Sequence, residues 1–264
     1  MCGRYLITSS PEAIRNLFRY PEEPDFPPRY NIAPTQPVPV VRLVAGTRSF
    51  ALVRWGLIPA WVKEPNAFSL LINARGETVG DKPAFRNAIR YRRCLFPADG
   101  FYEWKSDGGR RRPFCIRPRD GGPIALAGLW ETWAGPHGEE VDTACIVTTA
   151  ANRSLAPIHD RMPAVIAPEA FDMWLDCERV DSTMAAALIA PAPDDLFEAY
   201  EISTAVNRTA NDSPDLIAPL GAAAPELPPQ TDGGKSDAVP AAPAAPARRP
   251  RAKPKEDDGQ MSLL

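Results

Sequence analysis

The residues best suited to chemistry in this chain lie at its start, in Met1-Cys2-Gly3-Arg4-Tyr5. Cys2 is small enough for the initiator methionine to be removed, which would leave an α-amine and a thiol on neighbouring carbons. Their reference pKa values, about 7.7–8.0 and about 8.5, leave both groups partly reactive near neutral pH. Such a pair can hydrolyse an amide, or condense with an aldehyde to an imine that the thiol closes into a thiazolidine ring. The alternative is an idle terminus, since chain ends are often poorly ordered.

Three further polar side chains stand where chemistry is favoured. Asn73 appears where an apolar run stops, a usual place for a binding loop. Glu103 interrupts the apolar sequence Phe101-Tyr102-Glu103-Trp104; burial would raise its pKa and suit it to proton transfer, whereas the alternative is an outward position on an alternating strand. His159, one of two histidines, is either a loop residue with satisfied hydrogen bonds or an acid or base near pH 7.

Charge is distributed unevenly along the chain. Residues 1–120 carry 20 Lys and Arg against 11 Asp and Glu, a net charge of +9, whereas residues 121–220 carry 4 against 16, a net charge of −12. A polyanion such as a nucleic acid would therefore meet the N-terminal half, although a solvated basic face without a ligand is the alternative. Trp61 and Trp104 are either core residues or platforms on which unpaired bases stack.

The cysteine and histidine pattern argues against a metal centre. Five cysteines form no C-x-x-C pair, and only two histidines accompany them, so we expect neither a zinc site nor a cofactor. Cys94, Cys115 and Cys145 lie in strand-like runs and are expected to be small buried hydrophobes. With no signal peptide and no apolar run of about 18 residues, the sequence indicates a reduced, cytoplasmic protein without a membrane span.

Strands and short helices must position these side chains. Strand-like runs cover residues 38–44, 49–55, 94–104, 113–117, 124–133, 143–149 and 198–203. Helix signals cover residues 11–19, a segment from Asp81 to about residue 93, and residues 169–176 and 183–189. Because no βαβ unit repeats, the order favours an α+β fold on an antiparallel or mixed sheet. From about Gly221 the chain becomes rich in Ala and Pro, which predicts one domain, residues 1–220, and a disordered tail, residues 221–264.

Six ordered motifs resemble those of the SRAP family, the SOS response-associated peptidases. They are Met1-Cys2-Gly3-Arg4-Tyr5, Tyr30-Asn31-Ile32-Ala33-Pro34, Trp55-Gly56-Leu57-Ile58-Pro59, Asn73-Ala74-Arg75 with Glu77-Thr78, Phe101-Tyr102-Glu103-Trp104 and His159-Asp160-Arg161-Met162-Pro163. One such motif would be weak evidence, but six in order are specific. The resemblance implies a single barrel-like domain with short peripheral helices.

The resemblance also implies a function: sensing abasic sites in single-stranded DNA and trapping the ring-opened deoxyribose in a covalent thiazolidine crosslink. Cys2, freed of Met1, would supply the amine and the thiol, and Asn73 would orient the amine. Glu103 would shuttle protons, and His159 would assist opening of the sugar ring and support AP-lyase cleavage by β-elimination. Phosphates would be held by Arg4, Arg75 and Arg161, and bases would pack on Trp61 and Trp104. The protein would be a monomer, cytoplasmic and nucleoid-associated when bound to DNA.

Two other functions stay open at the level of sequence. The first is a cysteine peptidase or autoprocessing hydrolase, in which Cys2 attacks an amide with His159 as base; the family's name points to this chemistry. The second is a non-catalytic nucleic-acid-binding module whose terminal cysteine is incidental.

Overall fold

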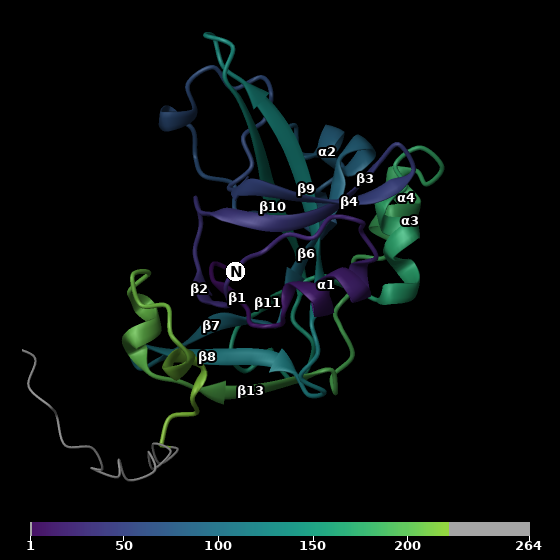
Figure 1. The fold of residues 1–264 in the computed structure, drawn as a ribbon. Helices are drawn as coiled ribbons and strands as arrows, with labels where there is room; N and C mark the ends of the chain where they lie inside the picture. Colours follow the sequence, from purple (N-terminus) through teal and green to yellow (C-terminus); the bar gives the residue numbers. More distant parts are fainter. Residues whose placement is uncertain (1, 222–264) are drawn as a thin grey trace, which may run out of the picture. The chain divides into compact units, whose positions relative to one another are not determined.

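A computed structural model describes residues 2–221 of the chain (Figure 1). The chain divides by its contacts into residues 1–222 and 223–264, and only the first unit concerns us below. The tail predicted for residues 221–264 lies outside the described residues, apart from Gly221. Within residues 2–221, no helix is long and apolar enough to cross a membrane.

The described residues form thirteen strands, with only short helices between them. The strands are β1 (Tyr5–Ile7), β2 (Arg29–Ile32), β3 (Pro37–Val44), β4 (Thr47–Trp55), β5 (Asn73–Arg75), β6 (Arg93–Ala98), β7 (Gly100–Asp107), β8 (Arg110–Pro118), β9 (Ile124–Ala134), β10 (Glu140–Ala150), β11 (Arg161–Pro163), β12 (Val165–Ile166) and β13 (Phe197–Glu201). The α-helices are α1 (Pro11–Phe18), α2 (Arg86–Tyr91), α3 (Phe171–Leu175) and α4 (Ser182–Ala186). Short 3-10 turns are η1 (Pro65–Ala67), η2 (Gly76–Thr78), η3 (Pro168–Ala170), η4 (Thr204–Asn207) and η5 (Pro214–Ile217). The predicted α+β class is confirmed.

Five strands close into a barrel. β4 pairs with β3, β3 with β6, β6 with β9 and β9 with β10, all antiparallel. β10 then returns to β4 through a short parallel contact at residues 143–144 and 54–55. Inside the barrel wall the indole of the fully buried Trp55 donates to the Ile72 carbonyl at 3.0 Å. Closure leaves few free strand edges, and it confirms the predicted barrel-like, mixed sheet.

A second, antiparallel sheet has the strand order β13-β8-β7-β1-β2. The main hydrophobic core is shared by this sheet and the barrel, and it includes Cys2 together with Tyr5 and Ile7 of β1. The short strand β1 therefore carries the first residues of the chain into the interior.

The chain passes from the barrel to the second sheet at Asp99 and Gly100. The sequence predicted one strand over residues 94–104, but β6 ends and β7 begins on either side of Asp99. The Asp99 carboxylate accepts the backbone N–H groups of Thr8 at 2.6 Å and Ser9 at 2.8 Å. A side chain at Gly100 would come within 2.6 Å of a β8 carbonyl. This junction separates β6, in the barrel wall, from the strand that carries Glu103.

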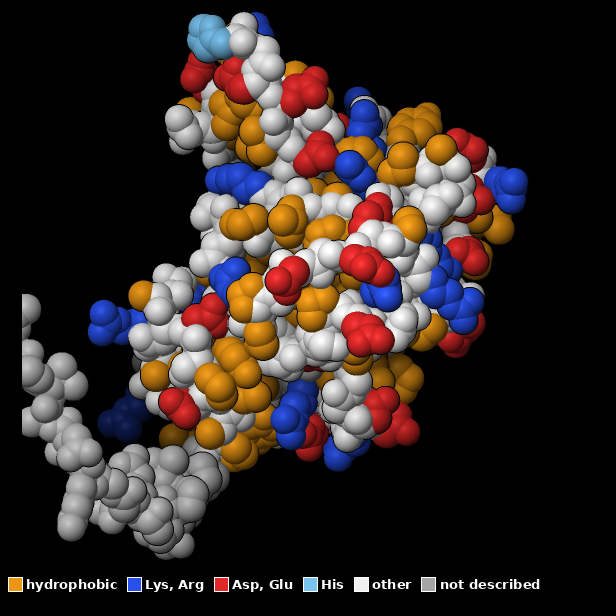
Figure 2. All heavy atoms as spheres, viewed as in Figure 1, with side chains coloured by type: hydrophobic (Ala, Val, Ile, Leu, Met, Phe, Trp, Pro, Cys, Tyr) orange, Lys and Arg blue, Asp and Glu red, His pale blue; other side chains and the backbone are white. Residues whose placement is uncertain are grey.

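α1, α3 and α4 begin within two residues of their predicted starts, and all four helices are shorter than predicted. The Ser10 hydroxyl accepts the Ala13 N–H at 3.2 Å and caps α1, as the sequence predicted. The predicted start at Asp81 was wrong: residues 81–85 form turns, in which the Phe85 N–H donates to the Lys82 carbonyl at 2.9 Å, and α2 begins at Arg86 without a side-chain cap. Figure 2 shows basic and acidic side chains interspersed over the same face of the molecule as in Figure 1.

Candidate functional site

Cys2 is buried in the main hydrophobic core, with 0% of its surface exposed. Its thiol points to the Arg4 carbonyl at 3.8 Å, and its own carbonyl accepts the Asn73 side-chain Nδ2 at 2.8 Å. Burial first, and the nearby Glu103 carboxylate second, raise the pKa of the Cys2 thiol far above its usual value. The sulfur is therefore a neutral thiol near pH 7 and needs a base before it can attack.

Asn73 reaches Cys2 from the barrel side. Residues 73–75, predicted as a loop, form the short strand β5, which runs parallel to β10 with Asn73 opposite Ile146. Its Nδ2 is held by the Cys2 carbonyl, and its Oδ1 is buried without a hydrogen-bond partner among the described residues. A buried acceptor without a donor is costly and needs an explanation. A donor arriving beside Cys2, such as an amine or a sugar hydroxyl, would satisfy it.

Glu103 and His159 face each other across the two sheets. Glu103 lies on β7 and is only 3% exposed. Burial raises the pKa of the Glu103 carboxyl, and the nearby His159 partly opposes that rise. His159 Nε2 lies 4.0 Å from Glu103 Oε2. A carboxyl group with a raised pKa beside an imidazole can pass protons near neutral pH.

The protonation of the His159 ring follows from its neighbours. The backbone N–H of Arg161 donates to His159 Nδ1 at 2.9 Å, so Nδ1 is the acceptor and a neutral ring carries its proton on Nε2, towards Glu103. The Asp160 carboxylate also lies 3.0 Å from Nδ1. That carboxylate is largely exposed, whereas the Arg161 amide is fixed in β11, so we assign the tautomer from the amide.

The three predicted phosphate-binding arginines have different surroundings. Arg75 is exposed, and within residues 2–221 it forms no ion pair. Arg4 is half-buried, and burial lowers the pKa of its guanidinium. Arg161 forms a two-pronged ion pair with Glu77, at 2.6 and 2.9 Å, and this contact lowers the pKa of the Glu77 carboxyl. The Arg161 charge is thus already neutralised, whereas Arg75 offers its charge to solvent.

The two predicted base platforms are also unlike each other. Trp104 follows Glu103 on β7 and lines the same cavity as Glu103 and Arg4. Trp61 is 59% exposed and packs edge-on against Phe68, with ring centroids 5.6 Å apart. The structure thus places Trp104 at the cavity that Glu103 lines, while Trp61 lies on the loop between β4 and β5.

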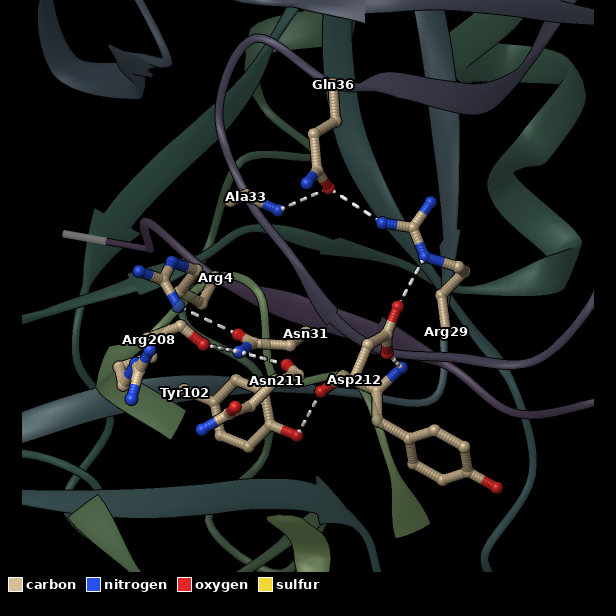
Figure 3. A network of polar contacts seen from close by, with 10 residues as sticks. Arg4, Arg29, Asn31, Ala33, Gln36, Tyr102, Arg208, Asn211 and Asp212 are labelled. Carbon is tan, nitrogen blue, oxygen red and sulfur yellow. Dashed lines mark hydrogen bonds and ion pairs between the residues drawn. The ribbon is translucent and has the colours of Figure 1, made fainter. Parts of the chain in front are cut away.

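Sequence analysis missed the part played by Asn31, a fully buried residue of β2. Its Oδ1 accepts Arg4 Nη1 at 2.8 Å (Figure 3). Its Nδ2 donates to the carbonyls of Val206 at 3.1 Å, Arg208 at 3.1 Å and Asn211 at 2.8 Å. Arg4 also donates to the Val206 carbonyl at 2.8 Å. Asn31 and Arg4 together hold residues 204–212 against the site; the only sequence signal was the place of Asn31 inside the Tyr30–Pro34 motif.

Within residues 2–221, no group of three or more His, Cys, Asp or Glu side chains is placed to hold a metal ion. Cys94, Cys115 and Cys145 are buried, as the sequence predicted.

Fold and site together define an α+β protein in which buried Cys2 is bonded to an asparagine and lies near a glutamate that faces a histidine. The family model described as "SOS response associated peptidase (SRAP)" matches residues 1–209. The chain therefore belongs to the SRAP family, as the six motifs indicated.

Known relatives agree with this assignment. The chain is similar to the abasic site processing protein YoqW of Bacillus subtilis (strain 168), with 37% identity over 221 residues that cover 82% of this chain and 99% of YoqW. It is also similar to the abasic site processing protein YedK of Escherichia coli (strain K12), with 35% identity over 233 residues that cover 83% of this chain and 100% of YedK. A solved structure of a Bacteroides thetaiotaomicron protein matches with a TM-score of 0.73 and 25% identity, over 83% of this chain and 99% of that one.

Proposed function

We propose that this protein processes abasic sites in single-stranded DNA by forming a thiazolidine crosslink through Cys2, once Met1 has been removed. The arrangement around Cys2 carries the proposal. The Cys2 carbonyl accepts a hydrogen bond from Asn73 Nδ2, and the buried Asn73 Oδ1 has no donor among the described residues. His159 Nε2 lies 4.0 Å from Glu103 Oε2. The names of the relatives, which are abasic site processing proteins, support the same substrate.

The first chemical step is imine formation. The Cys2 amine adds to the C1′ aldehyde of the ring-opened sugar to give a carbinolamine, which loses water to become an imine. Asn73 Oδ1 accepts an N–H of the amine and so aims its lone pair at the aldehyde carbon. Glu103, as the neutral acid, protonates the departing hydroxyl, which leaves as water, and it keeps the negative charge.

The second step closes the ring. The Glu103 carboxylate takes the proton of the Cys2 thiol and keeps it, which restores the neutral acid. The sulfur bonds to the carbon of the imine, which the loss of water left protonated on nitrogen, and that proton becomes the ring N–H. The sum of both steps is one aldehyde and one aminothiol giving a thiazolidine and one water. His159 donates a hydrogen bond from Nε2–H to the sugar ring oxygen as the ring opens, and the proton of the C1′ hydroxyl ends on that oxygen. In the uncyclised imine His159 can also support β-elimination.

The geometry favours this chemistry over a cysteine peptidase. A peptidase needs a thiolate, and its reactive cysteines have lowered pKa values, whereas burial raises the pKa of Cys2. A binding module without catalysis would not account for the buried Glu103 carboxyl with its raised pKa. Nor would it account for the buried Asn73 Oδ1, which lacks a hydrogen-bond donor among the described residues.

The test uses mature protein, in which the loss of Met1 is checked by intact mass. This protein is mixed with a single-stranded oligonucleotide that contains one abasic site. We expect a heat-stable conjugate with the natural chain and none with Cys2→Ala. Cys2→Ser should keep an imine that borohydride traps, because its amine remains, but should give no stable adduct without the reductant. Cys177→Ala is the matched control, since Cys177 is a half-buried cysteine that none of the contacts above places at the site. A heat-stable adduct with Cys2→Ala would refute the thiazolidine.

A further inference from the structure

A cavity of about 400 Å³ opens directly beside Glu103. Its lining residues are Gly3, Arg4, Glu103, Trp104, Arg111 and Asn207. Two of these, Arg111 and Asn207, belong to none of the six sequence motifs. Arg111 lies on β8, opposite Ser106 of β7 in the hairpin that also carries Glu103 and Trp104. The cavity therefore continues the reaction centre along this hairpin.

The arginines that line this cavity differ from those further along β8. There, Arg112 pairs with Glu201 and Asp107, and Arg117 pairs with Glu198. Among residues 2–221, in contrast, no carboxylate forms an ion pair with Arg111 or Arg4. Arg4 donates to the neutral oxygens of Asn31 and Val206. Two uncompensated guanidinium groups in one cavity favour an anionic ligand.

Asn207 adds a donor whose orientation is fixed. The Trp104 indole Nε1 can only donate, and it lies 2.8 Å from Asn207 Oδ1. The oxygen of the Asn207 amide is therefore occupied, and its NH₂ group is left as the donor side. Arg4 also holds the Asn207 carbonyl at 3.3 Å, and Asn31 fixes the residues on either side of it. The amide is thus held in place before any ligand arrives.

We propose that Arg111 and the Asn207 amide form a phosphate subsite that holds the DNA phosphodiester adjoining the abasic sugar. The proposal rests on the function proposed above and adds the group that is recognised. An abasic nucleotide has no base to recognise, so the invariant groups next to its aldehyde are the flanking phosphates. Arg111 supplies charge and Asn207 supplies a neutral donor, while Arg4 contributes charge from the other wall.

The test measures noncovalent binding to single-stranded DNA that carries a tetrahydrofuran abasic analogue, which has no aldehyde and cannot crosslink. Arg111→Ala should weaken binding about threefold to tenfold, the size expected for one charged hydrogen bond at a partly solvated site. It should also reduce the slope of log K against log salt by about 0.7, the value for one phosphate on a single strand. Arg110→Ala is the matched control, because Arg110 is exposed, lies next to Arg111 on β8 and does not line the cavity.

A second arm identifies the phosphate. A set of oligonucleotides is made, each with a single neutral methylphosphonate at a different linkage near the lesion. The binding of each one is measured for the natural chain, Arg111→Ala and Asn207→Ala. At the contacted linkage, the methylphosphonate and Arg111→Ala each remove the same interaction, so the two losses of binding free energy should not add. At every other linkage the two losses of binding free energy should add. Trp104→Phe keeps an aromatic side chain but removes the indole N–H that holds the Asn207 amide. It should therefore weaken the contact with the same linkage.

The outcomes separate the two proposals. If Arg110→Ala weakens binding as much as Arg111→Ala, or if the losses add at every linkage, the subsite is wrong while the crosslinking function stands. If the natural chain forms no adduct with the aldehyde-containing oligonucleotide, both proposals are overturned.

Discussion

Replacing Glu103 by glutamine tests the proton shuttle in the site. The substitution keeps the size of a side chain that is 3% exposed and removes its ability to exchange a proton. Both proposed steps need that exchange: loss of water from the carbinolamine needs the acid, and ring closure needs the base because the Cys2 thiol is neutral. We therefore expect Glu103→Gln to bind abasic DNA normally but to form the stable adduct slowly.

The magnitude follows from the role of a positioned acid or base. Such a group contributes about 10²- to 10⁴-fold to a rate, which corresponds to about 2.7–5.5 kcal/mol of activation free energy. His159, 4.0 Å from Glu103, is well placed to transfer some protons in its place, so we expect a loss near the lower end. A double variant that also lacks the His159 imidazole should then lose more than Glu103→Gln alone.

The same substitution should change how stability depends on pH. Because burial raises the pKa of Glu103 in the folded state, the native chain binds this proton more tightly than the unfolded chain. The favourable contribution is complete below the unfolded pKa of about 4.3 and is lost as pH rises through the raised folded value. Glu103→Gln, which cannot ionise, should show a flatter decrease of the unfolding free energy over that range.

The assay is a single-turnover time course of adduct formation, separated on denaturing gels at several pH values. Glu131→Gln is the matched control: Glu131 is also a buried glutamate, 7% exposed, with a pKa raised by burial, but it pairs with Arg92 and does not line the cavity beside Glu103. If Glu103→Gln formed the adduct as fast as Glu131→Gln over the whole pH range, the shuttle would be wrong.

Two further predictions concern the frame of the site. Asn31→Ala should lower the free energy of unfolding by about 1–3 kcal/mol, because it leaves buried carbonyls and one Arg4 donor without partners. Thermal unfolding measures this loss. An unchanged midpoint would contradict the hydrogen-bond network in Figure 3. Deleting residues 225–264 should leave the rate of adduct formation unchanged, since every proposed site residue lies within the family match at 1–209; a slower reaction would show that the tail takes part.

How much of this site the sequence predicted differs from residue to residue. Cys2 and Glu103 stood out on chemistry alone, because a terminal cysteine and a carboxylate among large apolar side chains are unusual in themselves. Asn73 was placed in a loop, although it lies on β5; a strand of three residues has too little pattern to be recognised. The break at Asp99 was also missed, because the contacts of its carboxylate with Thr8 and Ser9 join positions about ninety residues apart.

The arginines show where sequence reasoning stops. Arg4, Arg75 and Arg161 were equal candidates for phosphate contacts, because charge and motif do not reveal partners. The structure places Arg161 against Glu77, 84 positions away, and Arg4 against Asn31 and Val206. Arg111 belonged to no motif at all, yet it lines the cavity beside Glu103 without an ion pair among the described residues. Phosphate contacts depend on which cations are left uncompensated, and only the fold decides that.

Burial gives the site its order of events. It raises the pKa of both Cys2 and Glu103, so the sulfur is a neutral thiol near pH 7 and the Glu103 carboxyl holds its proton more tightly than an exposed one. The α-amine freed by removal of Met1 has an ordinary pKa of about 7.7–8.0 and would be the first reactive nucleophile. In the proposed mechanism, the loss of water from the carbinolamine would leave Glu103 ionised, and that carboxylate is the base that the thiol requires. Imine formation would therefore prepare ring closure, and on this mechanism a buried, neutral thiol suits an aldehyde trap better than a peptidase.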